Sequence, residues 1–166
     1  MVRLTRIGVV SDTHVPDRQK AIPEAILQGL GGVDLIIHAG DLTTLAVLDV
    51  LSGIAPVHAV SGNMDPPGVR ERLEKTALIQ VAGRTIAVMH GHGPPGDAEA
   101  LARRSFPDAD VVVFGHTHRA FQEYRGKTLI FNPGPAVRAL WWKASYGILY
   151  IEEDPAAPVR AEIRPI

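Results

Sequence analysis

Three short apolar runs near the N-terminus restrict the fold of this chain more than any other feature of its sequence. Residues 6–11, 33–39 and 56–60 are continuous rather than alternating apolar runs. Continuous runs of this length are typical of strands that are buried on both faces of a sheet. We therefore expect three strands within the first 60 residues, the first of them buried.

Two amphipathic stretches separate these strands and predict helices. Pro23 suits the first turn of the first helix, and Gly31-Gly32 is expected to end it. Thr43 or Thr44 is expected to cap the second helix. The apolar residues that recur at helical spacing are Ile22, Ile26, Leu27, Leu30 and, in the second stretch, Val47, Leu48 and Leu51. The resulting order, β-α-β-α-β, predicts parallel strands with right-handed crossovers.

The second half of the chain is richer in predicted strands. A turn at Ala82-Gly83 predicts a hairpin of residues 76–81 and 84–90, and Asp97 is expected to cap a helix that ends near Ser105. Further strands are predicted at residues 110–114, 121–125, 128–131, 146–152 and 159–164. With no repeat and no linker, residues 1–166 are expected to form a single α/β domain.

Composition excludes several classes of protein. Seventeen basic and eighteen acidic residues give a net charge of -1, so no general nucleic-acid binding is expected. No apolar run reaches the length of a membrane span, and the N-terminus does not have the pattern of a secretory signal. The chain has no cysteine, so any metal must be bound by imidazole, carboxylate or amide groups. A cytoplasmic location is the default expectation.

Polar side chains of the kinds that bind metals follow the predicted strands. Asp12 and His14 follow the first strand, and in an extended segment side chains two residues apart point the same way. The others are Asp41, Asn63, His90, His116 and His118, most of them beside a glycine. In open α/β sheets ligands bind beyond the carboxyl ends of strands, so these groups are expected to meet at one edge.

Seven nitrogen and oxygen donors are too many for one tetrahedral ion and suit two ions that share a carboxylate. Asp41 is the favoured shared group because each carboxylate oxygen can bind one ion. The spacing alone leaves open which ligand belongs to which ion.

The motifs resemble those of the calcineurin-like metallophosphoesterases, and most of all the small bacterial and archaeal phosphodiesterase branch. The resemblance covers residues 7–134 and rests on five blocks in order: Asp12-x-His14, Gly40-Asp41, Gly62-Asn63, His90 and Gly115-His116-x-His118. It implies two packed mixed β-sheets flanked by helices, an αββα sandwich with a bimetal centre at one edge.

The resemblance also implies roles for the seven residues. Asp12, His14 and His118 would hold one divalent metal, Asn63, His90 and His116 the second, and Asp41 would bridge them. The implied reaction is hydrolysis of a phosphodiester by in-line attack of a hydroxide that bridges the metals. Manganese is the favoured metal, with iron, zinc, cobalt or nickel as alternatives.

The chain departs from many relatives at Met64, where those relatives carry a histidine that assists the leaving group. A thioether cannot donate a proton, so esters with acidic leaving groups are expected to react best. His92 is a candidate substitute acid.

Each polar residue also has an ordinary explanation. Asp41 taken alone would be read as a helix cap, Asn63 as a left-handed turn residue, and His116 and His118 as loop histidines. His38 and His58 lie inside apolar runs, where a hydrogen-bonded core or supporting role is favoured over ligation. Trp141-Trp142 is expected to pack locally or at a subunit contact.

The expected substrate is a small phosphodiester such as a nucleotide. Two alternatives remain: a phosphomonoesterase with the same dimetal centre, and a non-catalytic scaffold, as in the retromer subunit that this fold resembles. A homo-oligomer is also left open.

Overall fold

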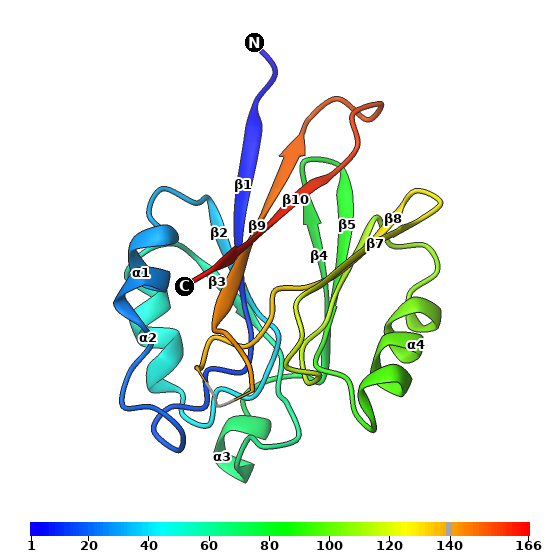
Figure 1. Ribbon diagram of the computed structural model, residues 1–166. Helices are drawn as coiled ribbons and strands as arrows, with labels where there is room; N and C mark the ends of the chain where they lie inside the picture. The colour runs from blue at the N-terminus through cyan, green and yellow to red at the C-terminus, as the bar shows by residue number, and fades with distance from the viewer. Residues whose placement is uncertain (139–140) are drawn as a thin grey trace.

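Two five-stranded sheets pack face to face, with helices covering their outer faces (Figure 1). The computed structural model describes residues 1–138 and 141–166. The architecture is the αββα sandwich of two mixed sheets that the resemblance implies.

The first sheet contains the three strands predicted near the N-terminus. Its order is β10-β9-β1-β2-β3, with β1 parallel to β2 and β2 parallel to β3, as predicted, and with β9 antiparallel to both β1 and β10. Its strands are β1 (Leu4–Val10), β2 (Leu35–His38), β3 (Val57–Ala59), β9 (Ser145–Glu152) and β10 (Arg160–Pro165).

The second sheet has three parallel central strands between two antiparallel edges. Its order is β4-β5-β6-β8-β7. Its strands are β4 (Thr76–Val81), β5 (Arg84–Met89), β6 (Val111–Val113), β7 (Phe121–Arg125) and β8 (Thr128–Asn132). The strands β1, β2 and β5 end at the lower side of Figure 1, and β6 is parallel to β5, so the loops that follow these strands gather there.

Four helices complete the described part of the chain. They are α1 (Glu24–Gly29), α2 (Ala46–Ser52), α3 (Pro67–Arg70) and α4 (Pro95–Ser105). One apolar cluster joins α1 and α2 to the outer face of the first sheet, and another joins α4 to the outer face of the second. A third cluster, which includes Val9, Ile37, Val113 and Phe131, fills the space between the sheets. Full burial of such a side chain stabilises the fold by about 1.5–3 kcal/mol relative to leaving it exposed.

The predicted helix caps are wrong in detail. The N-cap of α2 is Leu45, and Thr44 Oγ1 only accepts a hydrogen bond of 3.4 Å from the Ala46 amide. The Thr43 hydroxyl instead donates to the Val15 carbonyl at 2.5 Å, which ties the first two ligand loops together. Helix α4 begins after Pro94 without any side-chain cap.

The structure differs from the sequence predictions at two further places. Strand β3 is the edge strand, and His58 on it is exposed, so the core role predicted for His58 is wrong. Helix α3 was not predicted, because four residues are too few to show a helical period. Its first residue is Pro67, which suits a helix start because its missing N–H would have no partner there.

None of the helices in the described ranges is long and apolar enough to cross a membrane.

Candidate metal centre

All seven predicted ligands lie in loops that directly follow strands, at the common carboxyl edge of the two sheets. These loops have unusual backbone geometry. Left-handed φ values of 46° to 68° occur at Asp12, His14, Asp41, His116 and His118. Non-glycine residues seldom adopt this conformation, and it is concentrated at functional sites. The prediction that Asp12 and His14 lie in an extended segment is therefore wrong, although their side chains do converge.

The carboxylate of Asp12 has one oxygen held by the protein and one directed into the cluster. Its Oδ2 accepts hydrogen bonds from Ser11 Oγ at 2.6 Å and from the His116 amide at 3.2 Å. Its Oδ1 lies 3.3 Å from His118 Nε2, 3.7 Å from His14 Nε2 and 3.9 Å from His90 Nε2. The oxygen Oδ1 is therefore surrounded by three imidazole nitrogens.

Asp41 repeats this division between its two oxygens. Its Oδ1 accepts a hydrogen bond of 2.8 Å from the Met64 amide. Its Oδ2 lies 3.1 Å from His90 Nε2 and 3.7 Å from His14 Nε2. Asp41 does not cap a helix, so its ordinary explanation does not apply.

Asn63 lies on the other side of His90, between two imidazoles. Its Oδ1 lies 3.0 Å from His90 Nε2 and 3.1 Å from His116 Nδ1. The opposite nitrogens of the two rings face backbone carbonyls, because His90 Nδ1 lies 2.7 Å from the Ala39 oxygen and His116 Nε2 lies 2.7 Å from the Gly93 oxygen. If His90 Nδ1 and His116 Nε2 donate to those carbonyls, the other ring nitrogens, His90 Nε2 and His116 Nδ1, both face Asn63 Oδ1.

The donor set fits divalent metal ions. Asp12 Oδ1 and His14 Nε2 are buried and have no hydrogen-bond partner among the described residues. Buried polar atoms are normally paired, so an oxygen and a nitrogen that are unpaired and 3.7 Å apart are placed as two ligands of one cation would be. Two groups, Asp12 with His14 and His118, and Asp12 with Asp41 and His90, each place their ligand atoms within 4.8 Å of one another.

The histidines also form two pairs that match the predicted division between two ions. The rings of His14 and His118 are in edge contact, with centroids 5.4 Å apart, and those of His90 and His116 are 5.3 Å apart. Asp12 is the carboxylate common to both three-residue groups, while Asp41 Oδ2 faces one histidine of each pair. The role of Asp41 as the bridge stays a prediction.

The electrostatics of the cluster favour cation binding. Burial raises the pKa of Asp12, but the adjacent His118 and His14 rings and the charge of His90 outweigh burial and hold this pKa well below its usual value. Burial lowers the pKa of His90, yet contact with Asp41 and the charge of Asp12 raise it to about 9. A metal ion that binds His90 at neutral pH would therefore displace a proton from it.

His38 supports the loops without entering the cluster, as predicted. Burial lowers the pKa of His38 to about 3, so the imidazole is neutral. Its Nδ1 accepts a hydrogen bond of 3.2 Å from the Gly40 amide, which leaves Nε2 to donate to Thr13 Oγ1 at 3.0 Å. The ring thus connects the loop after β1 to the loop after β2.

Asp65 is a supporting residue that the sequence did not reveal. It is 2% exposed, and its carboxylate accepts backbone hydrogen bonds from Thr43 and Gly62 at 2.7 Å each and from Asp41 at 3.1 Å. The only available signal was an aspartate two residues after Asn63, in a turn. Three buried amides of two loops depend on this one side chain.

Two glycines allow the carboxylates to approach the backbone closely. A Cβ at Gly62 would overlap Asp41 Oδ1, and a Cβ at Gly115 would overlap Ser11 Oγ and lie 2.9 Å from Asp12 Oδ2. Their positions beside predicted ligands reflect a need for space rather than for a special φ value.

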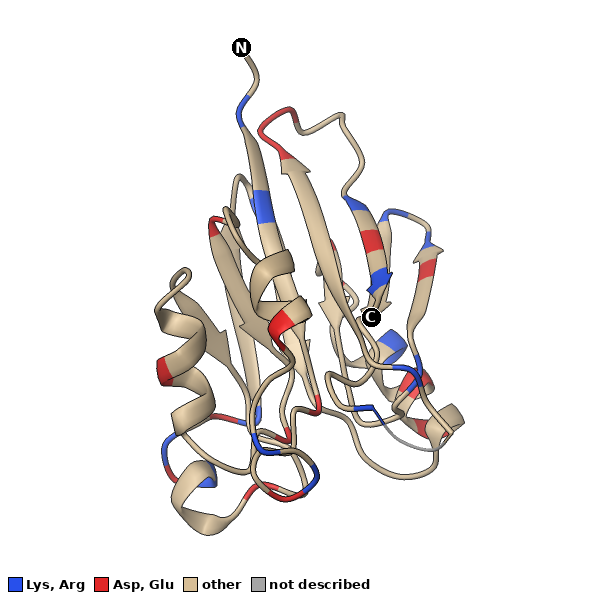
Figure 2. Cartoon of the chain, turned by 60° about the vertical axis from the view of Figure 1, so that its left-hand side comes forward, with Lys and Arg blue, Asp and Glu red and all other residues tan. Residues whose placement is uncertain are grey.

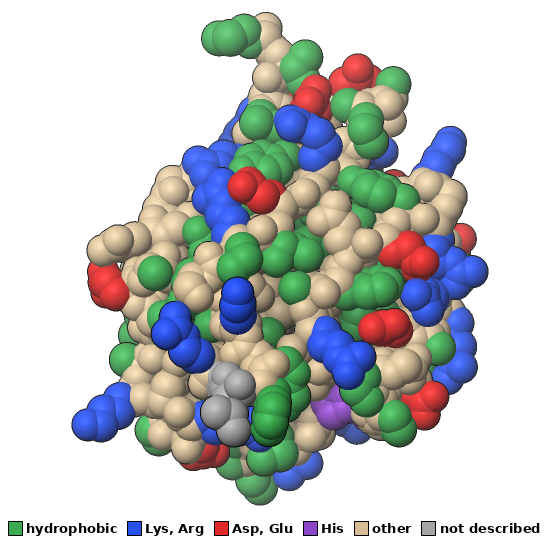
Figure 3. Space-filling model, in the orientation of Figure 1, with side chains coloured by type: hydrophobic (Ala, Val, Ile, Leu, Met, Phe, Trp, Pro, Cys, Tyr) green, Lys and Arg blue, Asp and Glu red, His purple; other side chains and the backbone are tan. Residues whose placement is uncertain are grey.

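Trp142 lies next to the cluster, which the sequence did not predict. Its ring is in edge contact with His118, with centroids 4.9 Å apart, whereas Trp141 is 81% exposed. Local packing, one of the two roles expected for this pair, is therefore confirmed for Trp142. Little histidine surface reaches the face of the molecule shown in Figure 3. Within the cluster, Asp12, His14, Asp41 and His90 are buried, whereas Asn63 is exposed.

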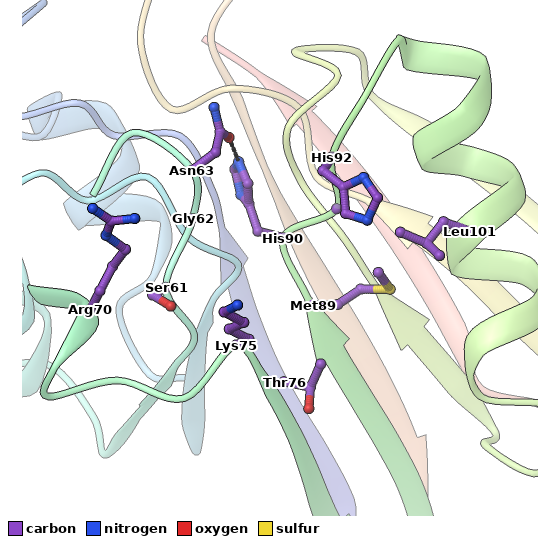
Figure 4. Close-up of a pocket in the computed structure, with 11 residues that line it drawn as sticks. Ser61, Gly62, Asn63, Arg70, Lys75, Thr76, Met89, His90, His92 and Leu101 are labelled. Carbon is purple, nitrogen blue, oxygen red and sulfur yellow. Dashed lines mark hydrogen bonds between the residues drawn. The ribbon is translucent and has the colours of Figure 1, made fainter. Parts of the chain in front are cut away.

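A cavity of about 380 Å³ begins at Asn63 and His90 (Figure 4). His92 is exposed and lines the same cavity, on the side of Leu101 and α4. The structure shows no hydrogen bond of the His92 side chain within the described residues, so its role as an acid stays a prediction.

Comparison with known proteins agrees with this geometry. Residues 5–154 match the calcineurin-like phosphoesterase superfamily domain. A probable metallophosphoesterase of Methanothermobacter thermautotrophicus is 40% identical over 130 residues, which cover 77% of this chain and 75% of that protein. A phosphodiesterase of Methanocaldococcus jannaschii is 28% identical over 89% of this chain and 94% of its own length.

Solved structures share the fold. Wild-type Vps29 from Entamoeba histolytica, complexed with Zn²⁺, superposes with a TM-score of 0.73 at 28% identity, over 97% of this chain and 99% of that one. Vps29 from Cryptosporidium parvum superposes with a TM-score of 0.78 at 20% identity, over 98% of each chain. From the extent of the domain match and the identity to its relatives, the chain belongs to the calcineurin-like phosphoesterase superfamily.

Proposed function

We propose that this protein is a metal-dependent phosphodiesterase with two divalent ions at the cluster. The observation that carries the proposal is the buried pair of unpartnered atoms, Asp12 Oδ1 and His14 Nε2, at the centre of a histidine and carboxylate cluster. The relative from M. jannaschii is named a phosphodiesterase, and the relative from E. histolytica was solved with Zn²⁺.

The proposed ligands divide as the two histidine pairs do. Asp12, His14 and His118 would hold one ion, Asn63, His90 and His116 would hold the other, and Asp41 would bridge them. Imidazole, carboxylate and amide donors suit manganese, our first choice, and also iron, zinc, cobalt and nickel.

The chain's own residues would prepare the site for a phosphodiester. Two bound divalent ions supply Lewis acidity toward phosphoryl oxygens and lower the pKa of a bound water. The Ser11 hydroxyl and the His116 amide hold Asp12 Oδ2. The Met64 amide holds Asp41 Oδ1 in the same way. One oxygen of each carboxylate therefore remains to bind an ion. The Ala39 carbonyl orients His90 through Nδ1. The adjoining cavity would hold one side of the substrate.

The first test is hydrolysis of an aryl phosphodiester with added Mn²⁺. We expect activity that disappears with a chelator, and a loss of about a thousandfold or more in kcat for Asp41→Ala and for His90→Ala, because each change removes a proposed ligand. His58→Ala is the matched control, since His58 is exposed on β3 and belongs neither to the cluster nor to the lining of the cavity. Activity that survives both ligand changes would overturn the mechanism.

A second prediction concerns the leaving group. Met64 is 50% exposed and its amide, not its side chain, contacts Asp41, so the side chain can be replaced without disturbing that contact. Met64→His would place a proton donor beside Asn63. We expect kcat/KM to rise by about tenfold or more for an alkyl phosphodiester and to change little for a nitrophenyl diester. Equal changes for both esters would contradict a role in leaving-group protonation.

A phosphomonoesterase is the second candidate, because the same ligands would serve a monoester. Matched nitrophenyl mono- and diesters with Mn²⁺ separate the two, and we expect the diester to react faster.

A non-catalytic scaffold is the third candidate, supported by the structural likeness to Vps29. A protein that binds no metal in elemental analysis and hydrolyses neither ester would favour it.

A further inference from the structure

The cavity that begins at Asn63 and His90 extends away from the metal cluster toward two cationic side chains. Arg70, at the end of α3, and Lys75, just before β4, line it (Figure 4). The cavity therefore joins the proposed second ion to a basic region that none of the proposed ligands explains.

The charge of the cavity lining is one-sided. The lining contains Arg70, Lys75 and the two histidines, and no aspartate or glutamate. Elsewhere the chain intersperses basic and acidic residues (Figure 2), and its net charge is -1. The lining of this cavity therefore differs from the rest of the chain, because it has basic side chains without acidic ones among them.

Neither Arg70 nor Lys75 forms an ion pair with another described residue. In the described ranges no carboxylate oxygen lies within 4.0 Å of the Arg70 or Lys75 nitrogens, although the neighbouring residues include Glu71 and Glu74. Neither glutamate lines the cavity. Both cations are exposed, so they can approach a ligand without a large desolvation cost.

The rest of the lining suits a neutral or apolar part of a ligand. Met89 and Leu101 provide apolar surface, and Ser61 and Thr76 provide hydroxyl groups. A volume of about 380 Å³ lies within the range of small-molecule sites. A ligand that spans the cavity would reach from Asn63 to the cations.

We propose that Arg70 and Lys75 form a second anion subsite. The preferred substrate would then be a phosphodiester that carries another anionic group on the part that occupies the cavity. A nucleotide diester with a phosphate besides the scissile one belongs to this class. The proposal deepens the phosphodiesterase function and rests on it. Guanidinium and ammonium groups both bind phosphate through charge-assisted hydrogen bonds.

Two matched substrates test the subsite. Both are the 5′-(p-nitrophenyl phosphate) ester of thymidine, one with a 3′-hydroxyl and the other with a 3′-phosphate. With Mn²⁺ and the full-length protein, we expect kcat/KM to be about tenfold or more higher for the 3′-phosphate ester. The double variant Arg70→Met with Lys75→Met should remove this preference, by lowering kcat/KM for the 3′-phosphate ester about tenfold more than for the 3′-hydroxyl ester.

Arg72→Met is the control variant, because Arg72 is exposed on the same segment but does not line the cavity. It should retain the preference for the 3′-phosphate. No preference in the wild type, an equal loss for both esters, or the same loss in Arg72→Met would each overturn the subsite. Hydrolysis of neither ester would instead refute the phosphodiesterase function, so the two failures are distinguishable.

Discussion

Replacing Asp12 by asparagine is expected to reduce phosphodiester hydrolysis by about a thousandfold or more while leaving the fold intact. The reason is that the two oxygens of Asp12 differ in their contacts: Oδ2 accepts two hydrogen bonds from the protein, and Oδ1 accepts none. Ser11 Oγ and the His116 amide both donate to Oδ2, so an asparagine would place its carbonyl there. Its NH₂ group would then point at the position of Oδ1, toward the histidines. The variant would lose a negative charge and present a donor where an ion needs an acceptor.

Metal binding gives a second measurement for the same variant. If Mn²⁺ is present at about 100 times its Kd, the wild type should gain about 2.7 kcal/mol of stability, which corresponds to a rise in Tm of roughly 5–10 °C. Asp12→Asn should show little of this rise, and elemental analysis should find less bound metal.

Asp17→Asn is the matched control for this change. Asp17 is an exposed aspartate in the loop that follows, with the same loss of charge on substitution. It should keep both the activity and the metal-dependent rise in Tm. A fully active Asp12→Asn variant that still responds to Mn²⁺ would contradict the placement of an ion beside Oδ1.

The sequence was sufficient to predict that several polar residues at strand ends lie close together, because strand ends are readable from apolar runs. A buried parallel strand leaves its carboxyl end at a known edge of the sheet, so Asp12 and Asp41 could be placed near one another without coordinates. The resemblance to a known family then supplied the sandwich of two sheets. Both results depend on features that are local in the sequence or shared by many relatives.

What the sequence did not reveal depends on contacts between distant segments. The left-handed backbone at Asp12 and His14 is maintained by hydrogen bonds from their amides to the Gly40 and Asp41 carbonyls, at 3.0 Å each, in a loop that lies almost thirty residues away. The exposure of His58 follows from the edge position of β3, which only the assembled sheet decides. Local propensity carries no signal for either feature.

Asp65 is the clearest example, and it gives the second large prediction. Asp65→Ala would leave the buried amides of Asp41, Thr43 and Gly62 without an acceptor. Each unsatisfied amide costs about 1–3 kcal/mol, partly relieved by water or relaxation. We expect the free energy of unfolding, measured with denaturant in the presence of a chelator, to fall by about 3–5 kcal/mol.

Activity should fall as well, because the same amides position Asp41 and the glycine that precedes Asn63. Asp65→Asn keeps one acceptor oxygen, so it should retain more stability than the alanine variant while its NH₂ group opposes one amide. This intermediate variant keeps the prediction testable if Asp65→Ala does not fold. Asp108→Ala, at an exposed aspartate far from the site, should change the free energy of unfolding by less than about 0.5 kcal/mol. If Asp65→Ala were as stable and as active as this control, the two loops would be held by other contacts, and the carboxylate of Asp65 would not be what aligns Asp41 with the histidines.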